Sequence, residues 1–136
     1  MKADSLRRGY FLEAAVALTV ARLVVHLLPS KWVFAWAGQP PRRTRRFGRD
    51  QVEWISWAVE TAGASPWIKA LCLPRALAAQ AMLRRRGIAS RLCLGVLRQN
   101  TSLVAHAWIE IGEEMIVGGA GASGFTKIAE YGRETS

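Results

Sequence analysis

The sequence predicts an α+β domain in which helices come first and a small antiparallel sheet follows. Three observations support this. Up to Gly87 the apolar residues recur mostly at helical spacing. After Gly87 they alternate as in strands. The two longest strand-like segments are joined by the tetrapeptide 99–102, whose residues are typical of a turn.

Composition narrows the class of protein. Hydrophobic residues make up 51% of the chain and charged residues 21%, which excludes a disordered protein. The net charge of +9 favours acidic or phosphate-bearing partners. Two cysteines do not form a disulfide framework, so a cytoplasmic location fits best. We expect a single domain over 1–136, with a helical segment at 1–37, a linker at 38–49 and the core at 50–136.

The first helix is predicted to end at Pro29. The charged or polar residues Glu13, Arg22 and His26 interrupt its apolar segment, so we expect neither a transmembrane span of ~20 residues nor a signal peptide. Its apolar residues form one stripe at helical spacing: Leu12, Val16, Val20, Leu23, Val24 and Leu27. We favour packing of this stripe on the domain core. Docking on a partner or a membrane surface is the alternative.

Two further helices are expected before the first cysteine. Ser30 is a plausible cap for a short helix over 31–37. The linker after it is typical of a solvated loop, and because it lacks interleaved aromatics we expect no nucleic acid as partner. Its five arginines are Arg42, Arg43, Arg45, Arg46 and Arg49. Asp50 and Glu53 fit a capping box that opens a helix running to about Ala62.

The next helix is predicted to begin at or beside Cys72. Pro74 is tolerated only in the first turn of a helix, and Gly87 is suited to its end. A thiol at this position meets unpaired backbone N–H groups and the positive end of the helix dipole, which favour a thiolate. Cys72 is therefore a candidate nucleophile. Cys93, in an apolar strand, is expected to be buried and inert.

Strands are predicted over 88–97, 103–111 and 114–117. The glycine-rich loop 118–124 lacks a phosphate-binding motif, and the last dozen residues are expected to form a weak helix or a tail.

The second strand carries the candidate general base, His106. It shares a face with Trp108 and Glu110, while the alternate residues face the other way. A cysteine at a helix start followed by a histidine on a strand is the order that a papain-like or transglutaminase-like thiol enzyme needs. The cysteines and histidines lack paired ligand spacing, so neither a metal nor a cofactor is expected.

These segments resemble one family. Residues 67–97 and 106–110 are similar to the transglutaminase-like leader peptidase of lasso-peptide biosynthesis, the protease domain of the B protein. The similarity lies in Cys72, Arg84-Arg85-Arg86-Gly87, Leu94-Gly95-Val96, His106-Ala107-Trp108-Ile109-Glu110 and the helix end Leu27-Leu28-Pro29. The resemblance implies a papain/transglutaminase-like fold, in which the helix bearing the nucleophile packs on a small antiparallel sheet. It also implies a cysteine protease that removes the leader from a ribosomally made precursor peptide.

The resemblance assigns Cys72 as the nucleophile and His106 as the base that takes its proton and later protonates the leaving amine. We expect the backbone N–H of Cys72 to stabilise the oxyanion. The family's third member, an aspartate on the strand after the histidine, has no match, because no Asp or Asn follows His106. Glu110 is a possible orienter of the histidine, although it lies roughly 13 Å along the strand. Glu113, Glu114, a backbone carbonyl or water are the alternatives.

The implied partners are the lasso precursor peptide and an ATP-dependent macrolactam synthetase, which closes the released core. The residues ahead of Cys72 do not resemble a winged-helix domain, so we predict a separate leader-recognition protein. The apolar stripe or the arginine-rich loop would be its docking surface. Two other functions stay open: acyl transfer to an amine, as in a transglutaminase or amidase, and a non-catalytic basic binding module.

Overall fold

The computed structural model describes residues 2–39, 49–64, 72–118 and 124–132. Within them the chain forms α1 (Lys2–Leu27), α2 (Ser30–Ala37), α3 (Arg49–Gly63), α4 (Cys72–Arg85), β1 (Arg91–Gln99), β2 (Ser102–Ile111), β3 (Glu114–Val117) and β4 (Thr126–Tyr131). The predicted α+β class, with helices before an antiparallel sheet, is confirmed. Of the arginine-rich linker, residues 40–48 lie outside the described part.

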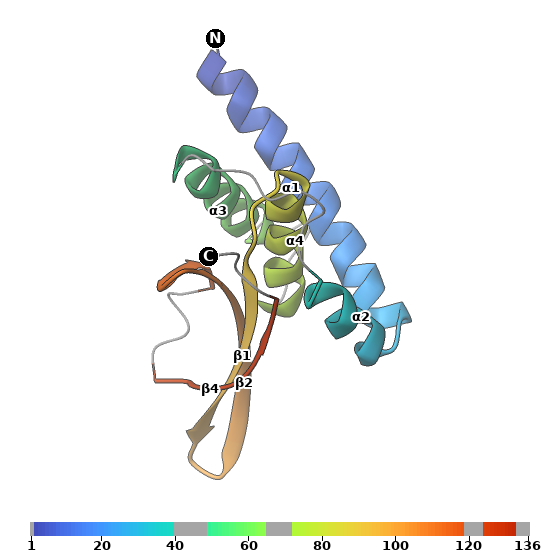
Figure 1. Cartoon of the computed structure of the whole chain (residues 1–136), viewed down its shortest axis with the longest axis vertical. Helices are drawn as coiled ribbons and strands as arrows, with labels where there is room; N and C mark the ends of the chain where they lie inside the picture. Colours follow the sequence, from blue (N-terminus) through green and yellow to red (C-terminus); the bar gives the residue numbers. More distant parts are fainter. Residues whose placement is uncertain (1, 40–48, 65–71, 119–123, 133–136) are drawn as a thin grey trace.

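The strands form one antiparallel sheet in the order β3-β2-β1-β4. β1 and β2 make a hairpin that extends beyond the helices (Figure 1). Its turn lies between Gln99 and Ser102, as predicted, and Asn100 adopts a positive φ of 55° there. Asparagine tolerates this left-handed conformation better than most residues.

The prediction of a terminal helix or tail is wrong for residues 126–131. They form β4, which pairs antiparallel with the outer edge of β1. The edge of β1 offers backbone N–H and C=O groups that need partners, and β4 supplies them. Because the two strands are separated by the whole hairpin and β3, this pairing has no local signal in the sequence.

The predicted start of β1 at Ile88 is also too early. The amide of Ile88 donates to the carbonyl of Leu83, and that of Gly87 to Arg84. These bonds close the C-terminus of α4, with Gly87 at a φ of 75°. Residues 88–90 therefore belong to the connection, and the ladder begins at Arg91.

The helices pack on one side of the sheet. α4 lies between the sheet and α1, α3 lies beside α4 and contacts β3, and α2 reaches β4 (Figure 1). Val52, Ile55 and Val59 of α3 are buried. The N-cap of α2 is Pro29, without a side-chain hydrogen bond, rather than Ser30.

The apolar stripe of α1 does not pack on the core. Its members Leu12, Val16, Val20, Leu23 and Leu27 are exposed, and only Val24 is half-buried. The buried face of α1 consists instead of Ala14, Leu18 and Ala21. Two small alanines on this face allow the backbone of α1 to approach α3 and α4 closely. The prediction of core packing for the stripe is therefore wrong, and the stripe faces outward.

α1 meets the length and hydropathy expected of a membrane span, with a mean hydropathy of 1.6 over Ser5–Leu27 and only 17% of that window buried. A core helix of a soluble protein or a signal sequence meets the same criterion. In this structure Glu13 of α1 accepts hydrogen bonds from the guanidinium groups of Arg85 and Arg86 at the end of α4. These charged contacts fix α1 against the C-terminal end of α4.

The Glu13–Arg86 pair predicts a pH-dependent contribution to stability. The hydrogen bonds from Arg86 lower the pKa of Glu13 below its ordinary value of 4.5, with a further Coulombic contribution from Arg85. A lowered folded-state pKa means that the stabilisation is present above pH 4.5 and is lost as the pH falls through the folded pKa. We expect Glu13→Gln to lower the free energy of unfolding by about 1–3 kcal/mol at neutral pH. Urea unfolding at several pH values measures this.

The matched control is Glu113→Gln, since Glu113 is exposed. It should change the free energy of unfolding by less than about 0.5 kcal/mol. A Glu13→Gln deficit that stayed constant down to strongly acidic pH would show that the loss does not come from the ionised pair.

Candidate active site

Cys72 is the first residue of α4, as Pro74 in the first turn predicts. Its side chain is half-buried and, together with Leu73, packs against the main hydrophobic core. The thiol is therefore placed at the helix N-terminus, where backbone N–H groups lack partners within the helix. Residues 65–71, which precede α4 in the chain, lie outside the described residues.

His106 lies in the middle of β2 and is half-buried. Its ring stacks on that of Trp108, with centroids 5.9 Å apart, and lies 5.4 Å from that of Phe125. Nε2 of His106 is 2.8 Å from the carbonyl oxygen of Gly118. A carbonyl can only accept, so Nε2 donates in this bond. In the neutral ring, Nδ1 is then the nitrogen free to accept a proton.

Two glycines allow this arrangement. Gly118 has a φ of 81°, and a Cβ there would lie 3.0 Å from the carbonyl oxygen of Ala107. Without that Cβ, the end of β3 comes close enough to β2 to present its carbonyl to His106. At Gly95 a Cβ would lie 2.7 Å from the Trp108 ring. Glycine at this position therefore makes room for the indole beside His106.

Glu110 is held by other partners than the histidine. Its Oε2 accepts from the indole N–H of Trp108 at 2.7 Å, and its Oε1 accepts from Arg91 and Lys127 at 3.0 and 3.1 Å. Burial raises the pKa of Glu110, but these hydrogen bonds and the nearby cations outweigh it, so the net pKa is lowered. Glu110 is thus an ionised acceptor that fixes the Trp108 ring.

No hydrogen bond joins Glu110 to His106 within the described residues. Of the other carboxylates considered from the sequence, Glu114 pairs with Arg49 at 2.7 Å and Glu113 is exposed. The contacts therefore favour the backbone alternative, in which the Gly118 carbonyl orients His106.

The structure does not bring Cys72 and His106 into contact. β2 joins the core that contains Cys72 through Ala107 and Ile109, whereas His106 lies on the other face with Trp108. In the part of the chain that is described, no hydrogen bond links the Cys72 thiol to the His106 ring. Proton transfer between them thus requires a rearrangement that brings Sγ within reach of Nδ1.

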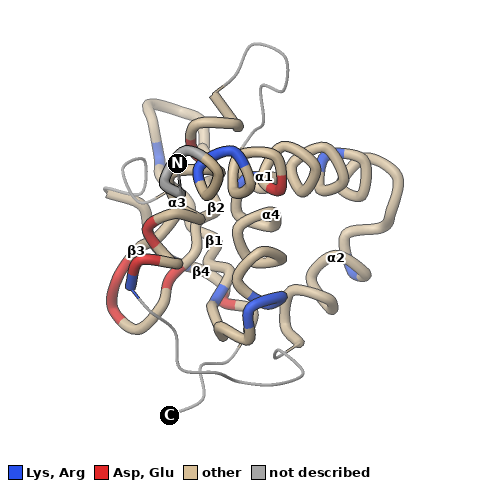
Figure 2. The backbone as a smooth tube through the Cα atoms, turned by 90° about the horizontal axis from the view of Figure 1, so that it is seen from above, with Lys and Arg blue, Asp and Glu red and all other residues tan. Residues whose placement is uncertain are grey.

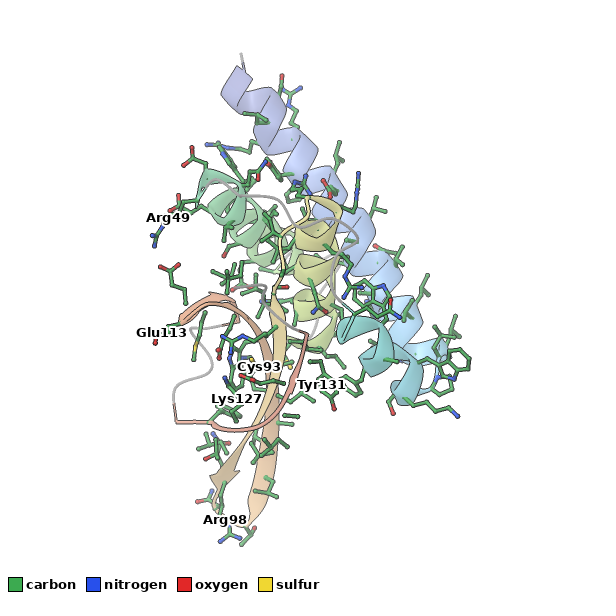
Figure 3. The ribbon with its side chains drawn as sticks, in the orientation of Figure 1. Arg49, Cys93, Arg98, Glu113, Lys127 and Tyr131 are labelled. Carbon is green, nitrogen blue, oxygen red and sulfur yellow. The ribbon has the colours of Figure 1, made fainter. Side chains whose placement is uncertain are left out.

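Cys93 is fully buried on β1 beside Trp108, as predicted. Burial, with a further contribution from the charge of Glu110, raises the pKa of Cys93 to about 12. Ligand atoms of Cys93, Glu110 and Glu130 lie within 4.8 Å of one another, a possible metal-binding group. However, the ammonium of Lys127 already bonds both carboxylates. Figure 3 shows Cys93 and Lys127 together on the sheet, so this cluster is better described as a salt-bridge network.

Sequence reasoning missed two features of the site. One is the Gly118 carbonyl, since a backbone oxygen has no residue-type signal. The other is the pair of cations that bond Glu110, Arg91 of β1 and Lys127 of β4. The alternation of His106, Trp108 and Glu110 was visible in the sequence, but their partners were not.

Residues 15–130 match the transglutaminase-like superfamily. This match spans most of the chain, including α2, α3, α4 and the sheet, together with Cys72 and His106. No curated protein and no solved structure matches the chain. The four described helices and four-stranded antiparallel sheet are consistent with a transglutaminase-like or papain-like fold.

Proposed function

Because the chain belongs to the transglutaminase-like superfamily, whose members are typically cysteine-dependent hydrolases or acyl transferases, we propose that it is a cysteine peptidase. Its substrate in this proposal is a lasso precursor peptide, from which it removes the leader. The observation that carries the proposal is the orientation of His106 by Gly118, downstream of a cysteine at a helix N-terminus. The motifs shared with lasso leader peptidases support the choice of substrate.

In this mechanism Nδ1 of His106 accepts the proton of the Cys72 thiol, and the thiolate attacks the scissile carbonyl. The backbone N–H of Cys72 donates to the resulting oxyanion. The imidazolium then gives its proton to the departing amine, which leaves as the new N-terminus of the core. Water, deprotonated by the same ring, releases the leader from Cys72 as a carboxylate.

The Gly118 carbonyl has a specific role in this scheme. By accepting from Nε2–H, it selects the tautomer whose Nδ1 is the base, and it holds the ring in one orientation. This assignment replaces the aspartate that the sequence lacks. The scheme also requires a rearrangement, because the Cys72 thiol and the His106 ring lie on opposite faces of β2 in this structure.

The partners belong to the same proposal. A separate leader-recognition protein presents the precursor, and an ATP-dependent macrolactam synthetase closes the released core amine onto an acidic side chain. A cytoplasmic location fits a chain whose two cysteines, Cys72 and Cys93, are both free thiols.

Acyl transfer to an amine is the second candidate, because the same superfamily includes both reactions and the fold does not select the acceptor. One experiment separates the two. The chain is incubated with the precursor peptide of its gene neighbourhood and the recognition protein, with and without a high concentration of glycinamide, and the products are weighed by mass spectrometry.

We expect a leader ending in a free carboxylate and an intact core, whether or not the amine is present. A leader or side chain carrying glycinamide would identify a transferase. An unaltered precursor, under conditions in which the precursor binds, would favour a non-catalytic binding module.

A further inference from the structure

An apolar groove of about 880 Å³ lies between α1, α2 and α4. It lies along the middle of α4 and the outer face of α1, and its lining includes neither Cys72 nor His106. A groove of this size is at the upper end of the range for ligand sites and can also accept the side chains of a docked helix.

The groove has a floor of small residues and walls of large ones. Ala17 and Ala21 of α1 and Ala78 and Ala81 of α4 form the floor, and all four are buried or half-buried. The walls are exposed: Val16 and Val20 on α1, and Trp32 and Trp36 on α2. Small residues between two tall ridges leave space that this chain's own side chains do not fill. This shape suits large apolar side chains projecting from a helix.

The α2 wall is held in place before anything binds. The guanidinium of Arg84 lies 4.0 Å from the centre of the Trp36 ring. The same group donates to the backbone carbonyls of Trp36 and Gln39, at 2.8 and 2.6 Å. Because these contacts tie α2 to α4, docking a helix would require little ordering of the groove.

The apolar surface extends beyond the groove. Leu23 and Leu27 of the α1 stripe do not line the groove, yet they are 54% and 76% exposed. A contiguous exposed apolar surface of this kind is typical of an interaction site.

Charge indicates which kind of partner fits. Arg85 lines the groove with its side chain 72% exposed, and Arg22 and Lys31 are exposed nearby on α1 and α2. The acidic residue of the lining, Glu13, is paired with both Arg86 and Arg85, so these cations outnumber it at this end of the groove. In Figure 2 basic residues lie along α1 and α2, whereas acidic residues gather around β3. The rim is therefore basic.

A second copy of the chain would bring a basic rim against a basic rim, which is repulsive. A flat lipid surface would cover the walls but leave the alanine floor unfilled. A partner with an apolar ridge and acidic flanks matches both the shape of the groove and the charge of its rim.

We propose that this groove binds an amphipathic helix with acidic flanks, presented by a separate protein. Large apolar residues spaced along one face of that helix enter between the valine and tryptophan walls, and its carboxylates meet Arg85 and Lys31. This proposal does not depend on hydrolysis, so its test uses the Cys72→Ala chain.

The probe is a fluorescent helical peptide of about 18 residues, five turns, with leucines at i, i+4, i+7 and i+11 and glutamates on both flanks. A matched peptide carries lysines in place of the glutamates. We expect the glutamate peptide to bind at least about tenfold more tightly by fluorescence anisotropy, with the difference shrinking as salt is added.

Val16→Glu and Ala81→Trp should each weaken binding of the glutamate peptide by about tenfold or more, one by adding an acidic group to the wall and the other by filling the floor. Leu103→Glu, which alters an equally exposed leucine on the distant hairpin, should leave binding unchanged. Thermal melting of each variant confirms that it folds. Val16 is an exposed position, so this variant keeps the test valid if Ala81→Trp does not fold.

Equal binding of the two peptides, or binding that both groove variants leave intact, would overturn the proposal. Two other results would also overturn the proposal if the glutamate peptide failed to bind. One is self-association of the chain in sedimentation velocity that Val16→Glu abolishes. The other is binding of the chain to phosphatidylglycerol vesicles that Val16→Glu abolishes. Leader removal by the unmodified chain is measured separately, so a failure of the groove proposal is distinct from a failure of the proposed peptidase activity.

Discussion

The Cys72→Ala chain is expected to lose leader removal, with kcat/KM at least about 10³-fold lower than that of the unmodified chain. Without the thiol no thioester can form, so the two-step route through a covalent intermediate is lost. Binding of the precursor should persist, because the substitution removes only the sulfur of a half-buried side chain. Product masses and single-turnover rates measure the two effects separately.

Cys93→Ala is the matched control, since it removes the other thiol of the chain. We expect it to reduce stability, because Cys93 is buried against Trp108, but to leave leader removal present. Activity that survived in Cys72→Ala and disappeared in Cys93→Ala, with both variants folded, would contradict the assignment of the nucleophile.

The two thiols should also differ in reactivity. With the pKa of Cys93 raised to about 12, its thiol stays protonated at every pH used for alkylation, and burial further protects it. Iodoacetamide followed by peptide mapping is therefore expected to modify Cys72 and not Cys93.

The second large effect is expected for His106→Ala, with a loss of about 10²–10⁴-fold in kcat/KM. This variant removes both the base that takes the thiol proton and the acid that protonates the leaving amine. Added imidazole should restore part of the activity, because it can enter the space left beside Phe125 and shuttle the proton. A merely structural histidine would give no such rescue.

His26→Ala is the control for this substitution. His26 is the other histidine of the chain and lies exposed in the last turn of α1. Leader removal should be unchanged in this variant. If His106→Ala retained full activity, the role of His106 as proton carrier would be wrong. The same conclusion would follow if imidazole did not rescue His106→Ala while Cys72→Ala was inactive.

The local features of the site were predictable from short stretches of sequence. Pro74 sets the start of α4 because its ring and missing N–H exclude any later position in the helix, and Cys72 follows from it. The β1–β2 turn and the range of β3 follow from turn residues and from alternation. Each of these signals involves neighbours within about five positions.

The predictions that were wrong concern segments whose local sequence is compatible with more than one packing arrangement. α1 has two faces that could be buried, the stripe containing Val16 and the face containing Leu18. The larger side chains of the stripe suggested burial, yet the small-residue face packs inward because alanine lets helices approach closely. Residues 126–131 were likewise ambiguous until the edge of β1 provided a partner.

The sequence by itself determined the order of elements up to β3, the helix-terminal position of Cys72, the face that His106 shares with Trp108, and superfamily membership. Only the tertiary structure decided that the Gly118 carbonyl bonds His106, that Glu110 pairs with cationic side chains, and that α1 leaves an apolar groove open. The first set depends on backbone restrictions and periodicity, which act between near neighbours. The second depends on contacts between segments that only folding brings together.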